Sequence, residues 1–142
     1  MIYTEEVFAI EDCLLDLCDK IIASPLAQKH LENRLSVETN PDAQAKEKEF
    51  IQAREKFERI EAYGKYAPDY TETRRKLRQE KRALDLDPHV SAFRISEREL
   101  QNTLDRVTYE IAQSVSSEIK IDAGNPFFEF AQRGCGGSCS VG

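Results

Sequence analysis

The sequence of 142 residues contains no tryptophan, and Gly64 is its single glycine before residue 124. Phosphate-binding loops such as GxxxxGK and GxGxxG need several closely spaced glycines, so residues 1–123 exclude them. No apolar run approaches the roughly 20 residues that cross a bilayer, and we expect no membrane span. The N-terminal segment MIYTEEVFAIED carries acids where a secretory signal needs bases, which favours a cytoplasmic protein.

The charge of the chain is negative overall but unevenly distributed. The formal net charge is −6, which argues against nucleic-acid binding by the whole surface but leaves a local patch open. Residues 1–19 hold six acids and no base, whereas residues 71–82 hold six bases and two acids. The two segments could be solvated helix faces, they could attract each other, or each could face a different partner.

Prolines mark the starts of several predicted helices. Ser24-Pro25, Asn40-Pro41 and Asp87-Pro88 each place a capping side chain before a proline, which is a typical helix start. Between these points the apolar residues recur every three or four positions, as on one face of a helix. The predicted stripes are Val7, Ile10, Leu14, Leu17 and Ile21; Leu31 and Leu35; Phe50, Ala53, Phe57 and Ile60; Tyr70, Thr73, Leu77 and Leu84; and Val90, Phe93, Leu100, Leu104, Val107 and Ile111.

The predicted fold is all-α, an elongated antiparallel bundle of about five helices with an irregular Cys/Gly tail. Residues 1–120 form the helical domain, and residues 121–142 form the tail, because five of the six glycines lie there. The last helix is the longest and is expected to continue to Glu118 or Ile119. A helix of about 30 residues is roughly 45 Å long, which suggests a seam that another chain covers, either a different protein or a second copy.

The helical domain shows no recognisable catalytic pattern. His30 and His89 have no partner motif nearby, and we expect structural roles for both. Cys13 and Cys18 lie on the first helix, where a free cysteine usually packs as a small hydrophobic residue. We therefore predict that the protein is not an enzyme.

The tail contains two thiols that cannot belong to a core. Cys135 and Cys139 lie in the segment RGCGGSCSVG, and thiolates are ligands for zinc and iron–sulfur clusters. Two cysteines supply half of the usual four ligands, so a second chain would supply the rest if a metal binds. Unused thiols, or a reversible disulfide that makes the protein a redox sensor, are the alternatives.

Three phenylalanines precede the tail cysteines. Phe127, Phe128 and Phe130 follow the turn-forming Asn125-Pro126, and burying each ring contributes up to about 3 kcal/mol. They pack either against the protein's own bundle or against a partner, where aromatic anchors are common.

Several segments together resemble the YlbF/YmcA family. These are the turn GKYAPDY at 64–70, the segment from Arg82 to Val107, GNPFF at 124–128 and CGGSC at 135–139, and the likeness covers nearly the whole chain. The resemblance implies a small helical protein without catalytic activity that assembles with YmcA-like and YaaT-like proteins. Such a complex carries 4Fe-4S clusters, directs mRNA processing by RNase Y and supports competence, sporulation and biofilm formation. It also implies that Cys135 and Cys139 help to ligate a cluster that a partner thiolate completes.

A second hypothesis is that the protein contacts RNA through a basic helix. Arg74, Arg78 and Arg82 share one face at spacings of four residues, and phosphate contacts would make binding fall steeply with salt. The nearby rings, Tyr63, Tyr66 and Tyr70, lie outside this run. The candidate RNA-contacting residues are Arg74, Arg75, Lys76, Arg78, Lys81 and Arg82.

Overall fold

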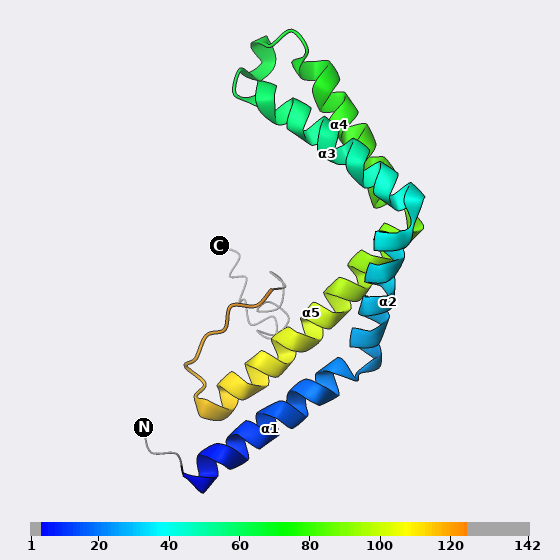
Figure 1. Ribbon diagram of the computed structural model, residues 1–142. Helices are drawn as coiled ribbons and strands as arrows, with labels where there is room; N and C mark the ends of the chain where they lie inside the picture. The colour runs from blue at the N-terminus through cyan, green and yellow to red at the C-terminus, as the bar shows by residue number, and fades with distance from the viewer. Residues whose placement is uncertain (1–3, 125–142) are drawn as a thin grey trace, which may run out of the picture. The chain divides into compact units, whose positions relative to one another are not determined.

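The computed structural model describes residues 4–124, which contain helices and loops but no strand, so the all-α prediction is confirmed (Figure 1). The chain divides into two compact units, Met1–Ser96 and Glu97–Gly142. The elements are α1 (Glu5–Ile22), α2 (Pro25–Thr39), α3 (Pro41–Glu61), the 3-10 turn η1 (Gly64–Tyr66), α4 (Tyr70–Asp85) and α5 (Pro88–Val115).

The predicted caps before Pro25, Pro41 and Pro88 are all present. The side chains of Ser24 and Asn40 accept hydrogen bonds from the backbone N–H groups three residues later, at 3.2 and 2.9 Å. Asp87 Oδ1 accepts from the N–H groups of His89 and Val90, at 2.9 and 3.2 Å. Each cap satisfies donors that the first turn of a helix leaves without intrahelical partners.

The hydrophobic core of the first unit lies where α2 and α4 end and where α3 and α5 begin. It consists of Ala43, Leu84 and Val90, with Val37 and Phe50 packed against them. The helices turn at this point through the short Asn40 and Leu86-Asp87 connections, which bring the four helix ends together.

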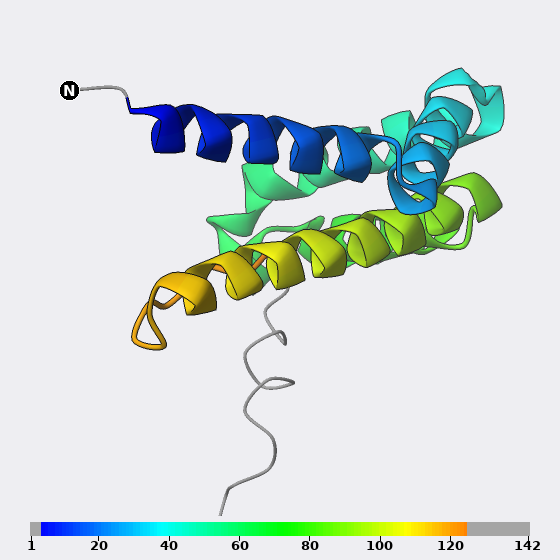
Figure 2. The same cartoon turned by 90° about the horizontal axis from the view of Figure 1, so that it is seen from below.

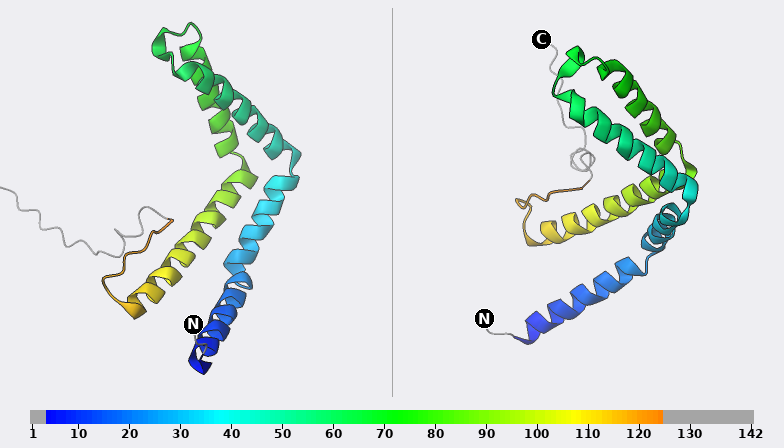
Figure 3. Two further views of the ribbon diagram at one scale, coloured as in Figure 1. Left: turned by 60° about the vertical axis from the view of Figure 1, so that its left-hand side comes forward. Right: turned by 45° about the horizontal axis from the view of Figure 1, so that its top comes forward.

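An antiparallel hairpin is formed by α3 and α4, which lie side by side in both views of Figure 3. Ala53 and Phe57 on α3 and Thr73 and Leu84 on α4 are buried, as the sequence stripes predicted. At the hairpin tip Gly64 has φ +59°, a left-handed conformation that glycine adopts without a Cβ penalty.

The helix α1 is joined to α2 by Ala23 and Ser24, where the chain changes direction (Figure 2). Ser24 Oγ donates to the carbonyl oxygen of Ile21 at 2.7 Å, and the N–H of Ala23 donates to the carbonyl of Asp19 at 2.9 Å. These bonds close the end of α1, and α1 then contacts α2.

In the second unit, Asp105 connects α5 to the segment that follows it. Its Oδ1 accepts from Gln101 Nε2 at 2.7 Å and from the N–H of Gly124 at 3.0 Å. The helix ends at Val115, not at Glu118 or Ile119 as expected, because the chain turns at residues 117–118. There the hydroxyl of Ser116 accepts from the N–H of Glu118, and such local bonding by serine competes with the helix. None of the helices within residues 4–124 is long and apolar enough to cross a membrane.

Candidate functional site

The most unusual surface of the described chain is the apolar face of α1. No residue of α1 is buried, although its sequence is amphipathic. Within the predicted stripe Val7, Leu17 and Ile21 are half-buried, but Ile10 and Leu14 are exposed. The exposed large side chains of α1 are Phe8 (53%), Ile10 (61%), Leu14 (50%), Leu15 (65%) and Ile22 (60%). Phe8, Leu14, Leu15 and Ile22 lie within about 120° of one another around the helix. We call these four the α1 apolar face, and exposed apolar faces of this kind are typical of interaction sites.

The apolar surface continues onto α2, where a prediction is wrong. Leu31 and Leu35 were expected to point inward, but they are 50% and 59% exposed. The inward side of α2 carries other residues, spaced three or four apart: Ala27 is buried, His30 stacks on Phe93, Asn33 Nδ2 donates to the carbonyl of Ala92, and Val37 joins the core. The sequence could not indicate that polar residues would face the neighbouring helix.

The two cysteines of α1 are also exposed, so the expectation that they pack as small hydrophobic residues is wrong. Cys18 follows Leu14 by four residues and precedes Ile22 by four, which places it within the α1 apolar face. Cys13 is five residues from Cys18 and therefore lies about 140° away around the helix. Because they point in different directions, the two thiols do not form a chelating pair on the helix.

A buried polar network surrounds the core of the first unit. Asp87 is only 2% exposed, and its Oδ2 accepts a hydrogen bond from Lys46 Nζ at 2.6 Å in addition to the helix-cap bonds. The hydrogen bond from the Lys46 ammonium is the main cause of the lowered pKa of Asp87. The backbone N–H groups of Val90 and His89 lower this pKa further, whereas burial of the carboxylate raises it. This network fixes the start of α5 against α3.

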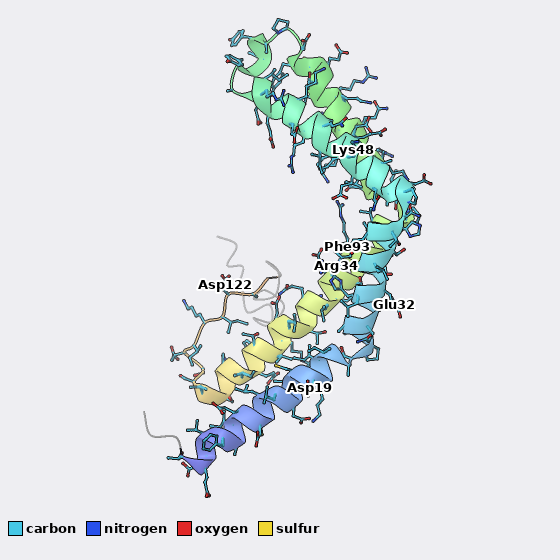
Figure 4. All side chains as sticks on the ribbon, viewed as in Figure 1. Asp19, Glu32, Arg34, Lys48, Phe93 and Asp122 are labelled. Carbon is cyan, nitrogen blue, oxygen red and sulfur yellow. The ribbon has the colours of Figure 1, made fainter. Side chains whose placement is uncertain are left out.

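Both histidines have structural surroundings, as the sequence predicted. His89 Nδ1 lies 2.7 Å from Ser36 Oγ and its Nε2 lies 3.1 Å from Asn40 Nδ2. Because Asn40 Oδ1 caps α3, its Nδ2 is the donor to His89, which fixes Nε2 as an acceptor. His30 stacks on Phe93 with ring centroids 5.1 Å apart, and Figure 4 shows Phe93 beside α2.

The exposed side of α4 carries the residues proposed to contact RNA. Arg74, Arg75, Lys76, Arg78, Lys81 and Arg82 are all exposed. Lys76 pairs with the buried carboxylate of Glu80, and Lys81 pairs with Asp85 at 2.8 Å. Lys81 and then Arg94 lower the pKa of Asp85. Among residues 4–124 no ion pair joins the acids of α1 to these bases, so the two charged segments do not neutralise each other within the described chain.

A surface pocket of about 440 Å³ lies between α3 and α4. Its polar lining includes Lys56, Arg75 and Lys76 together with Glu72 and Gln79. The pocket is open to solvent and brings basic side chains from both helices together, so it favours anions over cations.

The tail sites lie outside the described residues. This applies to Cys135 and Cys139, and to Phe127, Phe128 and Phe130, so the cluster and anchor hypotheses remain predictions, as does the division at residue 120. Within residues 4–124 no group of three or more His, Cys, Asp or Glu side chains could hold a metal ion.

The sequence analysis missed one feature of the buried polar network and one feature of the α1 apolar face. The pairing of Lys46 with Asp87 joins residues 41 positions apart, and no local pattern indicates it. Phe8, Leu15 and Ile22 also widen the α1 apolar face beyond the single predicted stripe. Their spacing of seven residues was a usable signal, since residues seven apart share a helix face.

Comparison with known proteins matches the chain to a family and to a curated relative. Residues 10–116 match the family described as "Control of competence regulator ComK, YlbF/YmcA". The chain is 35% identical over 142 residues to "Regulatory protein YlbF" of Bacillus subtilis (strain 168). The aligned region covers 100% of this chain and 95% of that protein.

A solved structure is similar in fold as well as in sequence. A chain in the crystal structure of Bacillus subtilis RicA in complex with RicF superposes with a TM-score of 0.72 and 34% identity. The match covers 80% of the present chain and 98% of that chain.

Proposed function

Because the chain belongs to the YlbF/YmcA family, we propose that it is a non-catalytic regulatory adaptor that binds a second helical protein through the α1 apolar face. One observation carries this proposal. The helix α1 is amphipathic, yet it buries no residue and exposes five large apolar side chains.

A partner helix would gain free energy by covering this face. Burying a half-exposed Leu or Ile side chain contributes about 1 kcal/mol, so several of them act together against the entropy cost of association. Leu31 and Leu35 on α2 extend the apolar surface. The related structure of RicA in complex with RicF supports a protein partner, since it shows that a chain of this fold occurs in a complex.

The proposed partner is a YmcA-like protein, joined by a YaaT-like protein. In this proposal the complex directs RNase Y-dependent mRNA processing and thereby supports competence, sporulation and biofilm formation. The relative named regulatory protein YlbF and the family description, which refers to control of competence, support a regulatory role. A homodimer is the proposed state of the protein alone, with one copy of the α1 apolar face covering another.

We test the pairing with two variants of α1 that add the same charge. Leu15→Asp changes the most exposed residue of the α1 apolar face, and Ala9→Asp changes an exposed residue about 120° away around the helix. The full chain is coexpressed with its YmcA-like partner, and copurification is measured. We expect Leu15→Asp to reduce the recovered partner at least tenfold and Ala9→Asp to leave it within twofold. Equal recovery with both variants contradicts the proposal.

We further propose that Cys135 and Cys139 contribute ligands to a 4Fe-4S cluster shared with partner chains, with Phe127, Phe128 and Phe130 anchoring the tail. The donor chemistry fits in part, because thiolates bind such clusters but four are usual. Among the described residues, no group of three or more His, Cys, Asp or Glu side chains could hold a metal ion by itself. When bound, the cluster would cross-link the tail to its partners.

The cluster proposal is tested by anaerobic coexpression with the partners. Cys135→Ser with Cys139→Ser is compared with Cys13→Ser, which leaves the α1 apolar face intact. We expect loss of iron and a lower yield of complex for the tail pair only. Unchanged iron and unchanged yield reject the ligand role, and a tail disulfide found by mass spectrometry of the thiol-blocked protein would favour the redox-sensor alternative.

A further inference from the structure

The helix α4 carries a row of exposed arginines on the side away from α3. Its buried residues are Thr73, Glu80 and Leu84, which face α3. Arg74, Arg78 and Arg82 are exposed and follow one another at four-residue spacing. The three Cα positions therefore span about 12 Å along the helix, and Arg75 and Lys81 flank the row.

Within residues 4–124, no ion pair neutralises the charges of this row. The ion pairs of α4 in the described chain join Lys76 to Glu80 and Asp85 to both Lys81 and Arg94. None of them involves Arg74, Arg75, Arg78 or Arg82. Like charges four residues apart on a helix repel each other. The overall charge of −6 weakens attraction at long range, but at physiological salt a local patch acts over about 8 Å.

Exposed aromatic rings lie at the tip of the same hairpin. Tyr63 and Tyr66 are 72% and 86% exposed, and η1, which contains Tyr66, packs against α4. Tyr70 differs, because its ring packs against Phe57 with centroids 5.5 Å apart. Lys65 Nζ lies 5.6 Å from the centroid of the Tyr66 ring and adds another positive charge at the tip.

We propose that the arginine row of α4 and the tyrosines of the hairpin tip form a binding surface for single-stranded RNA. Arginines that track phosphates, combined with aromatic rings on which bases stack, are the usual elements of single-strand binding. An acidic protein helix would satisfy the charges but would not use the exposed rings. Unpaired bases occur typically in RNA loops and ends, which favours RNA over DNA.

This surface differs from the surface proposed for partner binding. The arginine row lies on α4 and the α1 apolar face lies on α1, so substitutions in one leave the other intact. The two proposals therefore fail separately: a chain that binds its partner but not RNA rejects only the present inference.

The direct test is fluorescence anisotropy of the full chain with a labelled 12-nucleotide oligouridylate at 50 and 200 mM KCl. Four phosphate contacts predict that a plot of log affinity against log salt concentration has a slope of about −3. The affinity should therefore fall about 50-fold between these two salt concentrations. We expect Arg74→Gln with Arg78→Gln to weaken binding at least tenfold and to reduce the slope by about 1.4. The matched pair Lys48→Gln and Arg54→Gln on α3 removes the same charge and should change binding less than twofold.

The tyrosines supply a readout that charge alone does not. Tyr66→Ala should weaken binding about tenfold and leave the salt slope unchanged, because stacking does not release counterions. Absence of binding at 50 mM KCl overturns the proposal, as does equal loss for the α3 pair. Equally tight binding of polyglutamate would indicate an acidic protein partner instead, and equally tight binding of the oligodeoxyuridylate would reject the preference for RNA.

Discussion

The carboxylate of Asp87 connects two helices through bonds of two kinds. One oxygen caps α5 and the other accepts from Lys46 on α3, and the side chain is almost completely buried. Ionised Asp87 is therefore favoured by the fold, which agrees with its lowered pKa.

This residue makes the stability of the first unit dependent on pH. Because the pKa is lower in the folded chain than in the unfolded chain, the contribution is present above about pH 4 and is lost as the pH falls through the lowered pKa. We predict that Asp87→Asn lowers the free energy of unfolding by about 2 kcal/mol at pH 7, through loss of a charged hydrogen bond. Urea unfolding at pH 7 and at pH 3 measures this difference, which should shrink at the lower pH; a constant difference would argue against the ionised cap.

The backbone conformation at Gly64 restricts which residues can occupy this position. Its φ is +59°, and no neighbouring atom lies within 4 Å of the point that a Cβ would occupy, so a substitution is strained by conformation and not by crowding. We predict that Gly64→Ala lowers stability by about 1 kcal/mol and Gly64→Asn by less, since Asn tolerates the left-handed region. Thermal unfolding of the two variants tests this, and equal losses would contradict it.

At the scale of elements, the caps of α2 and α3 provide a matched pair. Ser24 and Asn40 both cap a helix that starts with proline, but Asn40 also donates to His89. We predict that Ser24→Ala costs about 1 kcal/mol and that Asn40→Ala costs clearly more. Chemical denaturation checks the order, and Asn40→Asp is the control that keeps the cap but loses the donor. If both alanine variants lose the same stability, the bond to His89 contributes nothing.

The same elements show what the sequence can predict. The starts of α2, α3 and α5 were predictable because a cap and its proline lie within three residues of the donors that the cap serves. The buried side of α2 was not, because Asn33 and His30 face α5 through contacts with residues about 60 positions away. The exposure of Leu31 and Leu35 likewise depends on which helix lies opposite, and no local spacing indicates that.

At the scale of the whole molecule, the sequence predicted some of the candidate binding surfaces better than others. The arginine spacing on α4 was readable directly, whereas the exposed tyrosines at the hairpin tip gained meaning only from the packing of η1 on α4. The acidic and basic segments carry opposite charges, yet within residues 4–124 no ion pair links them.

The proposed function depends most on the α1 apolar face being covered when the protein acts. Cys18 lies within that face, Cys13 lies about 140° from Cys18 around the helix, and both thiols are exposed in the chain alone. They are therefore a probe and its internal control on the same helix.

The decisive measurement is the alkylation rate of each thiol, followed by peptide mass spectrometry, for the isolated protein at low concentration and for the copurified complex. We predict that both thiols react in the isolated protein, and that in the complex Cys18 is protected at least tenfold while Cys13 is not. Protection of Cys18 in the isolated chain that disappears on dilution is what the proposed homodimer predicts. Equal reactivity of Cys18 in the diluted isolated protein and in the complex would contradict the adaptor role of α1.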